Sequence, residues 1–246
     1  MAILRLENIS KHFAGFQVLN SVSVDILEGE RHAVIGPNGA GKTTLFNIIS
    51  GVHQPTGGSI FLREKNITGD PVHKIARMGI SRSFQITNLY PKMTLHENVR
   101  NAVISKLNRR FSVAGLLSRN SRVERETNRV IDLVSLSDAK DVPAFELSYG
   151  KQRQLELALA LALDPDVVLM DEPTAGLNTQ ESRSAVELIR EVTKGKTLVI
   201  IEHDMDVVFR LVDRITVLDY GRVLATGTLD EIRSNEEVKN AYLGRQ

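Results

Sequence analysis

A glycine-rich segment, GPNGAGKT at residues 36–43, combines the residue types that bind phosphate groups. It matches the pattern GxxxxGK[ST], in which glycines let backbone N–H groups point at a phosphate, the lysine reaches the β- and γ-phosphate oxygens, and the hydroxyl binds Mg²⁺. Here the lysine is Lys42 and the hydroxyl belongs to Thr43. A strand pattern precedes the segment and a helical pattern follows it, which an ordinary turn with a solvated lysine would not require. The segment predicts a nucleoside triphosphate site with Mg²⁺.

Two acidic residues follow a second apolar run, VVLMDEP. Ligands of open α/β sheets bind beyond the carboxyl ends of the strands, where Asp171 and Glu172 would emerge. Asp171 can hold Mg²⁺, usually through water, and Glu172 can polarise the water that attacks the γ-phosphate. For this motif alone a solvated acidic turn is an equal alternative, but the phosphate loop favours the catalytic interpretation.

A third apolar run, TLVIIEH, ends in Glu202 and His203, so it brings a histidine to the same edge of the sheet. His203 can donate a hydrogen bond to the γ-phosphate and to the attacking water. A lone histidine is more often a structural residue. We expect that role for His12, His32, His53, His73 and His96.

The polar stretch LSYGKQ, residues 147–152, stands before the strongly helical run RQLELALALAL. A helix start has unpaired N–H groups and a partial positive charge, so it attracts anions. The same charge disfavours Lys151, unless an anion approaches it. This stretch is therefore a candidate anion site whose ligand the stretch itself does not identify.

The elements around these motifs alternate between strand and helix patterns. Strands are expected at ILRLENI, VSVDI, RHAVIG, SIFL, VVLMD, TLVIIEH, RITVLD and RVLATG, and helices over 42–50, 123–134, 152–163 and 179–192. Such alternation predicts an α/β fold with a parallel or mixed central sheet. VVLMD and TLVII are apolar throughout, as strands buried on both faces should be, so we place them at the sheet centre.

The segment from 88 to 163 differs, because its pattern is almost wholly helical. We expect a single domain, 1–246, in which 1–87 and 164–246 form the core and 88–163 is an inserted helical subdomain. Within it, the basic stretch LNRRFSVAGLLSRNSRVERE is expected to be a loop or a loosely packed element.

Composition limits the classes of partner. Lys and Arg number 31 against 30 for Asp and Glu, giving a net charge of +1, so no overall field favours nucleic acid or an anionic membrane. The chain has no cysteine, which excludes disulfides and thiolate metal sites. Its start lacks the apolar core of a signal peptide, and its longest apolar run, 157–163, is far shorter than the roughly 20 residues of a membrane span. A cytoplasmic protein is expected.

The order of the motifs resembles that of an ATP-binding cassette ATPase: the phosphate loop, SFQ at 83–85, LSYGKQ as the signature sequence, VVLMDEP, AGLN and IIEHD. Within that family the chain is most similar to the ATP-binding subunits of branched-chain amino acid importers, from SFQ...MTLHENV, DEPTAGLN, IEHDM and the terminal AYLG. The resemblance implies a P-loop NTPase core, an N-terminal antiparallel β subdomain and an inserted helical subdomain.

The resemblance also implies roles for individual residues. Phe13 would stack on the adenine, with a core aromatic as the alternative, and Gln85 would reach Mg²⁺ and the attacking water. Thr43, Gln85 and Asp171 would be the metal ligands. The residues holding the triphosphate would be Gly36, Pro37, Asn38, Gly39, Ala40, Gly41, Lys42, Thr43 and Thr44.

Members of the family work as head-to-tail dimers with two ATP molecules in the interface. The resemblance implies that Ser148 and the backbone of Gly150 meet the γ-phosphate bound to the other subunit, which supplies the anion that LSYGKQ lacks. The common signature has two glycines followed by a glutamine, and here Tyr149 replaces the first glycine and Lys151 the glutamine, whereas Gly150 is kept. The chain also has Asn178 where an aspartate is common, and we expect this cross-interface contact to survive.

The implied function is hydrolysis of MgATP to drive solute import, of branched-chain or other amino acids, through transmembrane permease subunits. The ATPase would form a homodimer or pair with a paralogous subunit, and would contact a substrate-binding protein only indirectly. It would lie on the cytoplasmic face of the inner membrane, touching the membrane only through the permease, which would dock at 86–99 unless that segment is a plain linker. The alternatives are a urea or amide importer, a lipopolysaccharide exporter, a soluble switch acting on nucleic acid or ribosomes, and a phosphotransferase. Nucleic acid is not among the partners that we expect for this protein.

Overall fold

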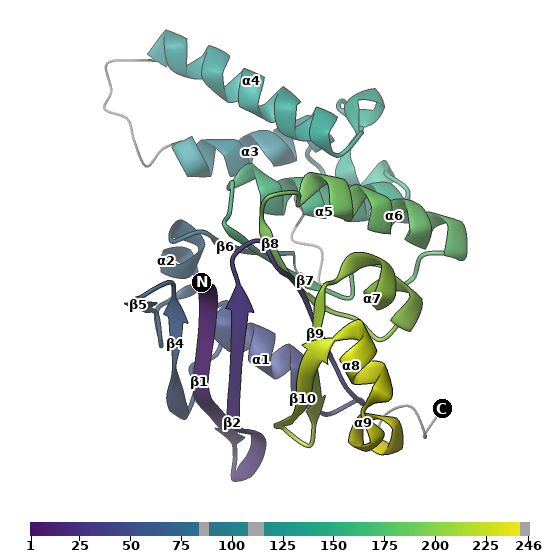
Figure 1. Ribbon diagram of the computed structural model, residues 1–246. Coiled ribbons are helices and arrows are strands. Elements are labelled where there is room, and N and C mark those ends of the chain that lie inside the picture. The colour runs from purple at the N-terminus through teal and green to yellow at the C-terminus, as the bar shows by residue number, and fades with distance from the viewer. Residues whose placement is uncertain (84–88, 108–115, 242–246) are drawn as a thin grey trace.

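The computed structural model describes residues 1–83, 89–107 and 116–241, with backbone only at 116–120 and 241 (Figure 1). Two β-sheets lie at the centre of the molecule, and the helices between residues 95 and 162 gather on one side of them. Among the described residues, no helix is long and apolar enough to cross a membrane.

The first sheet is antiparallel and comes from the N-terminal part of the chain. Its strand order is β2 (Phe16–Leu27), β1 (Ala2–Phe13), β4 (Gly57–Leu62) and β5 (Lys65–Asn66). Along β2, buried apolar side chains alternate with polar side chains that are mostly exposed, as the period of two in a strand requires, and in β1 the polar side chains are half-buried or exposed. This sheet confirms the predicted N-terminal antiparallel unit.

The second sheet is mixed and carries the predicted motifs. Its order is β10 (Arg222–Thr228), β9 (Arg214–Asp219), β3 (Arg31–Ile35), β8 (Thr197–Ile201), β7 (Val167–Asp171) and β6 (Ile80–Ser83). All neighbours are parallel except β10 and β9. Every residue of β7 and β8 is buried, as expected for apolar strands inside a parallel sheet. The carboxyl ends of β3, β7 and β8 therefore meet at one edge.

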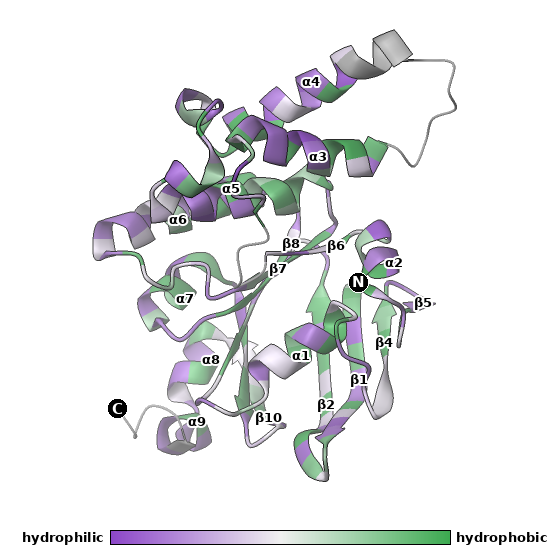
Figure 2. Ribbon diagram, turned by 180° about the vertical axis from the view of Figure 1, so that it is seen from behind, coloured by the Kyte–Doolittle hydropathy of each residue, from purple (hydrophilic) through white to green (hydrophobic). Residues whose placement is uncertain are grey.

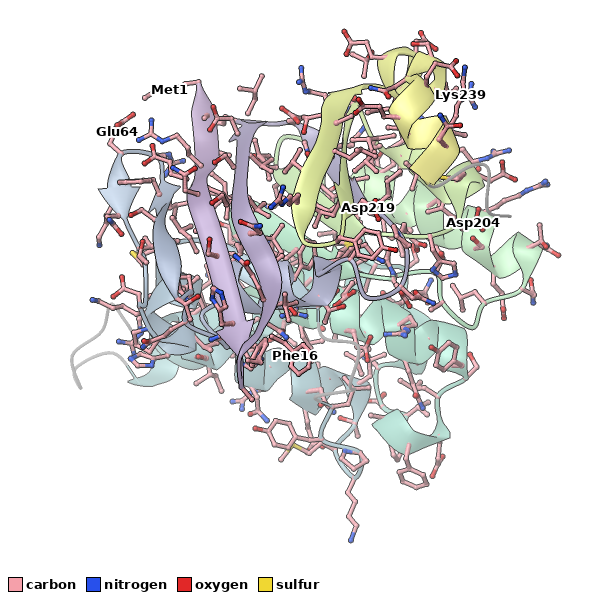
Figure 3. The ribbon with its side chains drawn as sticks, turned by 90° about the horizontal axis from the view of Figure 1, so that it is seen from below. Met1, Phe16, Glu64, Asp204, Asp219 and Lys239 are labelled. Atoms are coloured by element: carbon pink, nitrogen blue, oxygen red, sulfur yellow. The ribbon has the colours of Figure 1, made fainter. Side chains whose placement is uncertain are left out.

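One helix joins the two sheets. Helix α1 (Lys42–Ile49) packs Leu45, Phe46, Ile48 and Ile49 into a core made by both sheets. Figure 3 shows the first sheet lying beside β10, and Asn20 N–H donates to the carbonyl of Gly221 at 2.8 Å where the two sheets meet. The phosphate-loop helix is thus held on both sides.

The other face of the mixed sheet is covered by α5 (Tyr149–Ala162), α6 (Thr179–Val192) and α7 (Met205–Leu211). In Figure 2 the strands of this sheet are coloured mainly hydrophobic, whereas α6 carries many hydrophilic residues. Polar residues thus lie on the part of α6 that does not pack on the sheet.

The described part of 88–163 is helical, as predicted. It contains α3 (Leu95–Leu107), α4 (Leu116–Leu133), the 3₁₀ turns Ser137–Ala139 and Ala144–Glu146, and α5, with a single isolated bridge between Thr94 and Pro143 among those residues. The expected loop over 107–126 is wrong from Leu116 onward, because α4 begins there; 108–115 lie outside the described residues. The helix forms because Val123, Val130 and Ile131 recur at helical spacing and are buried.

Several short elements were not predicted: α2 (Val72–Arg77), α7, α8 (Leu229–Ser234), α9 (Glu236–Ala241), β5 and β6. Each has seven residues or fewer, too few to display a clear hydrophobic period. Strand β6 has the sequence ISRS. It lacks an apolar face and instead contains Arg82, which forms a buried ion pair with Asp171.

Candidate active site

The phosphate loop connects β3 to α1 and approaches the rest of the protein very closely. A Cβ at Gly36, where φ is 150°, would lie 2.1 Å from the Leu218 carbonyl oxygen. A Cβ at Gly41, where φ is 100°, would lie 2.6 Å from Cδ2 of Leu19. Only glycine fits both the space and the positive φ at Gly41, so the loop can lie against both sheets.

The Lys42 ammonium is already held inside this loop. It donates to the carbonyl oxygens of Gly36 at 2.7 Å and Pro37 at 3.0 Å. Burial lowers the pKa of Lys42, and the negative charges of Glu172 and Asp171 oppose that shift. Asn38, Gly39 and Thr43 are exposed on the outer side of the loop, where a triphosphate would approach.

Asp171 ends β7 with its side chain fully buried. Its Oδ2 lies 3.0 Å from Nη2 of Arg82, whereas its Oδ1 has no hydrogen-bond partner among the described residues. Burial raises the pKa of Asp171, and the guanidinium of Arg82 opposes the rise. A buried carboxylate oxygen with open acceptor capacity is the kind of ligand that Mg²⁺ requires.

Arg82 is a site residue that the sequence analysis missed. Its Nη1 donates to Oδ1 of Asn47 at 2.7 Å and to Oγ of Ser50 at 3.1 Å, both at the end of the phosphate-loop helix. Arg82 therefore ties β6 and α1 to the end of β7. A charged residue inside the sequence ISRS was the available signal, because a cation buried in a sheet requires an anion.

Glu172 and His203 meet at the carboxyl ends of β7 and β8. Glu172 has φ 48°, and its N–H donates to the carbonyl of Ile201 at 2.9 Å. Its Oε1 lies 3.7 Å from Nδ1 of His203, whose side chain is 63 % exposed. Both side chains are therefore accessible to a ligand at this edge of the sheet.

Glu202, next to His203, is buried and joins two loops. Its Oε1 accepts hydrogen bonds from Oγ1 of Thr174 at 2.6 Å and from the Thr174 N–H at 3.3 Å, and its Oε2 accepts from the N–H of His203 at 3.1 Å. The loop that follows Glu172 is thus held against the end of β8. The sequence showed Glu202 but gave no means of identifying its partner.

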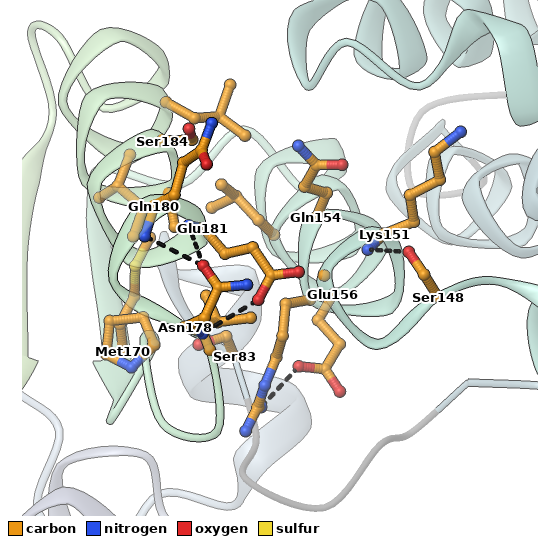
Figure 4. A pocket seen from close by; sticks show the side chains of 18 of the residues that line it. Ser83, Ser148, Lys151, Gln154, Glu156, Met170, Asn178, Gln180, Glu181 and Ser184 are labelled. Carbon is orange, nitrogen blue, oxygen red and sulfur yellow. Dashed lines mark hydrogen bonds and ion pairs between the residues drawn. The ribbon is translucent and has the colours of Figure 1, made fainter.

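The signature stretch begins α5 and is close to α6 (Figure 4). Ser148 is the N-cap, and its Oγ accepts from the N–H of Lys151 at 3.4 Å. The Lys151 ammonium lies 2.7 Å from Oδ2 of Asp138, in a pair whose two side chains are 38 % and 70 % exposed. In the single chain, then, a carboxylate already balances Lys151. A cavity of about 480 Å³ lies beside this helix, and its lining includes Ser148, Gly150, Asp171 and Asn178.

Asn178 has a structural role that was not predicted. Its Oδ1 accepts from the N–H groups of Gln180 and Glu181, both at 3.0 Å, and Glu181 Oε2 accepts from the N–H of Asn178 at 3.0 Å (Figure 4). This capping box starts α6. The departure from aspartate therefore keeps the oxygen that a helix cap requires.

Phe13 stands at the end of the β1–β2 hairpin and is 39 % exposed. Its ring contacts His53 edge-on, with centroids 5.4 Å apart, and the Lys11 ammonium lies 4.8 Å from its centroid. Contact with adenine stays a prediction. Gln85 lies outside the described residues. Of the histidines expected to be structural, His32 is fully buried and lies 2.6 Å from Glu30 and 2.8 Å from Thr216.

A phosphate loop between a parallel strand and a helix, with Asp171, Glu172 and His203 at the same sheet edge, defines a P-loop nucleotide hydrolase. The family model described as ABC transporter matches residues 19–175, and one described as branched-chain amino acid ATP-binding cassette transporter matches 222–246. The chain belongs to the ABC transporter family and is an ATPase subunit of that type.

Several relatives that match over their full length are named as branched-chain amino acid transport ATP-binding proteins. The chain is 39 % identical to the high-affinity branched-chain amino acid transport ATP-binding protein LivG of Salmonella typhimurium, over 98 % of both chains. It is 40 % identical to BraF, the corresponding protein of Pseudomonas aeruginosa, again over 98 % of both chains.

Solved structures agree with these relatives. The ADP conformation of an ATP-binding cassette of an ABC transporter matches with a TM-score of 0.83 and 31 % identity over 100 % of both chains. A dimeric cassette in a post-hydrolysis state, bound to ADP and Pi, matches with a TM-score of 0.78 and 29 % identity over 92 % of this chain and 98 % of that one.

Proposed function

We propose that this chain hydrolyses MgATP as a dimer and thereby drives import of branched-chain or other amino acids through transmembrane permease subunits. The observation that carries the proposal is the meeting of Lys42, Asp171, Glu172 and His203 at one sheet edge. The chain that carries them is similar over its full length to branched-chain amino acid transport ATP-binding proteins.

The chemistry is in-line attack of water on the γ-phosphate. Lys42 moves from the carbonyls of its loop to the β- and γ-phosphate oxygens, and Glu172 orients the attacking water and accepts its proton. His203 donates to the γ-phosphate. Mg²⁺ would be held by Thr43 and Asp171, with Gln85 by family resemblance, and would supply charge neutralisation on the phosphates. The remaining triphosphate contacts come from the backbone N–H groups of the phosphate loop.

The second half of each ATP site comes from another subunit. We propose that Ser148 and Gly150 contact the γ-phosphate bound to a partner ATPase, either a second copy or a paralogue, and that Asn178 faces the same interface. Phe13 stacks on the adenine with the ring face that Lys11 does not cover. In this arrangement ATP joins the subunits and hydrolysis releases them.

We propose that the helical part 88–163 is a subdomain inserted between 1–87 and 164–246. The segment 86–99, at the margin of this subdomain, is proposed to contact the permease. Within it, Tyr90 is 58 % and Met93 37 % exposed, whereas Leu89 packs against the core. Two exposed apolar side chains near a helix start suit a helix of a partner protein. The ATPase would then lie on the cytoplasmic face of the inner membrane.

Replacement of the proposed catalytic carboxylate tests the ATPase function. Glu172→Gln keeps the size and hydrogen-bonding capacity of the side chain but removes the base, so ATP binding should persist while turnover falls by roughly 100-fold or more. The variant should also form a dimer with ATP and revert to a monomer with ADP, as measured by analytical ultracentrifugation. Turnover at the wild-type rate would refute the assignment.

Purification from the native membrane tests the transport role. A permease pair and a binding protein should accompany the chain, and leucine, rather than urea, should stimulate ATP hydrolysis by the reconstituted complex. Stimulation by urea alone would redirect the proposal to an amide importer, lipopolysaccharide in the complex would indicate an exporter, and recovery with ribosomes would refute transport.

A further inference from the structure

Tyr149 joins the signature stretch to the loop that follows Glu172. It is the first residue of α5, between Ser148 and Gly150. Its hydroxyl donates to the carbonyl of Ala175 at 3.0 Å and accepts from Nη2 and Nε of Arg153 at 2.8 and 3.1 Å. The hydroxyl oxygen thus has one outgoing and two incoming hydrogen bonds, all within the range of well-formed contacts.

The loop is shaped to receive the tyrosine ring. Gly176 has φ 79°, and a Cβ there would lie 3.1 Å from Cε1 and 3.3 Å from the hydroxyl oxygen of Tyr149. The guanidinium of Arg153 lies 5.2 Å from the centroid of the ring and also pairs with Glu156 at 2.9 Å. The ring therefore has a defined position although 47 % of the residue is exposed.

The same loop has a second attachment at its other side. Glu202 holds Thr174, the second residue after Glu172, and Tyr149 holds the next residue, Ala175. Two adjacent residues of the loop are therefore tied to different elements: one to the end of β8, beside His203, and the other to the start of α5.

We propose that Tyr149 is a positioning residue that couples the two ATP sites of the dimer. This inference rests on the proposed function, in which Ser148 and Gly150 contact the partner's triphosphate while Glu172 acts on the triphosphate of its own subunit. A shift of the α5 start on meeting phosphate moves the Tyr149 hydroxyl, and through it Ala175 and the backbone leading to Glu172. Occupation of one site thereby adjusts the carboxylate of the other.

The Tyr149 hydroxyl is not needed for α5 to begin. Ser148, not Tyr149, provides the side-chain cap of α5, and the helix is anchored by buried residues such as Leu155 and Ala158. Removing one hydroxyl should therefore leave α5 folded and change only its connection to the loop.

The test is Tyr149→Phe, with Tyr220→Phe as the matched control because Tyr220 is 78 % exposed and lies in the turn between β9 and β10. In steady-state ATP hydrolysis, wild type and Tyr220→Phe should show a Hill coefficient of about 2, the limit for two sites, and Tyr149→Phe a value of about 1. The kcat of the Tyr149→Phe variant should fall by roughly 5-fold or more, whereas its KM and the affinity of its monomer for ADP should change by less than about 2-fold.

Dimer formation separates coupling from loss of the interface. In a Glu172→Gln background, Tyr149→Phe should still dimerise at the same ATP concentration within about 2-fold, since Ser148 and Gly150 are intact. Unchanged cooperativity in Tyr149→Phe, non-cooperative wild type, or loss of dimerisation in the double variant would each overturn the coupling role. Absence of ATP-dependent dimers in Glu172→Gln alone would instead overturn the proposed function, and the coupling with it.

Discussion

At the scale of single residues, the site contains charges that are buried and paired with each other. Asp171 and Arg82 are both almost inaccessible, at 0 % and 6 % side-chain exposure, and form an ion pair of 3.0 Å. Removing one member of a buried pair leaves the other charge without compensation in a poorly solvated environment. Arg82 should therefore matter for stability as well as for the position of the predicted metal ligand.

Arg82→Met should lower the free energy of unfolding by about 3–5 kcal/mol, because the Asp171 carboxylate stays buried without its partner. Urea unfolding of the purified chain at neutral pH measures this change. Arg129→Met is the control, since Arg129 pairs with Glu126 on the exposed side of α4, where the side chains are 53 % and 36 % exposed, and should cost less than about 1 kcal/mol. Equal effects of the two substitutions would contradict the importance of the buried pair.

At the scale of elements, polar contacts determine how the strands that carry the site are joined. His32 in β3 lies between Glu30 at 2.6 Å and Thr216 in β9 at 2.8 Å. Glu30 also accepts from the N–H of Leu27 at 3.0 Å, at the end of β2. One carboxylate thus connects the first sheet to the strand that leads into the phosphate loop.

Glu30→Gln should reveal how the contribution of the Glu30 carboxylate to the free energy of unfolding depends on pH. Burial alone would raise the pKa of Glu30, but the hydrogen bonds from His32 and Leu27 outweigh it and hold the pKa below its ordinary value of 4.5. A lowered pKa stabilises the folded state above the unfolded-state pKa, and this contribution is lost as the pH falls through the folded-state pKa.

The expected loss is about 1.5–3 kcal/mol at pH 7, measured by chemical unfolding, and the difference from wild type should shrink as the pH falls below 4.5. Glu187→Gln, on the exposed face of α6, should change stability little at either pH. A difference that grows at low pH would have the wrong sign and would refute this account.

Elements also show where sequence reasoning succeeds. The strands β7 and β8 are almost wholly apolar, β3 ends in the apolar residues AVI, and all three are followed by clear motifs, so their order along the chain and their common edge were predictable. The start of α4 was missed because its many charged and serine residues resemble a loop, and its helical form depends on burial of Val123, Val130 and Ile131 beneath α3 and α5. Strand β6 was missed because its stability depends on an ion pair with another strand.

At the scale of the whole molecule, the role proposed for the signature stretch requires a second subunit. In the single chain Lys151 pairs with Asp138 at 2.7 Å, so the lysine near the helix start is balanced by an exposed carboxylate. Exposed pairs of this kind contribute little free energy and are weakened by salt. A triphosphate with several negative charges can therefore compete for the same ammonium.

Lys151→Gln and Asp138→Asn should change ATP-dependent dimerisation in opposite directions. In the Glu172→Gln background, loss of the lysine should raise the ATP concentration needed for dimers by roughly 2- to 10-fold at low salt, and loss of Asp138 should lower it, because the ammonium is then free for phosphate. Sedimentation at low and high ionic strength measures the ATP concentration at which each variant dimerises. The differences between the variants and the parent protein should diminish at high salt. If Lys151→Gln has no effect at low salt, the anion site belongs to Ser148 and Gly150 alone.

The sequence by itself determined the class of this protein, because the phosphate loop and the motifs that contain Asp171, Glu172 and His203 are recognised from residue types directly next to strand and helix patterns. Their common edge followed from the geometry of parallel strands. Only the tertiary structure decided the contacts between distant segments: Arg82 with Asp171, Glu202 with Thr174, Lys151 with Asp138, and Tyr149 with Ala175. Hydrogen bonds and ion pairs depend on distances of a few tenths of an ångström between residues far apart in the chain, and local sequence patterns carry no information about such distances.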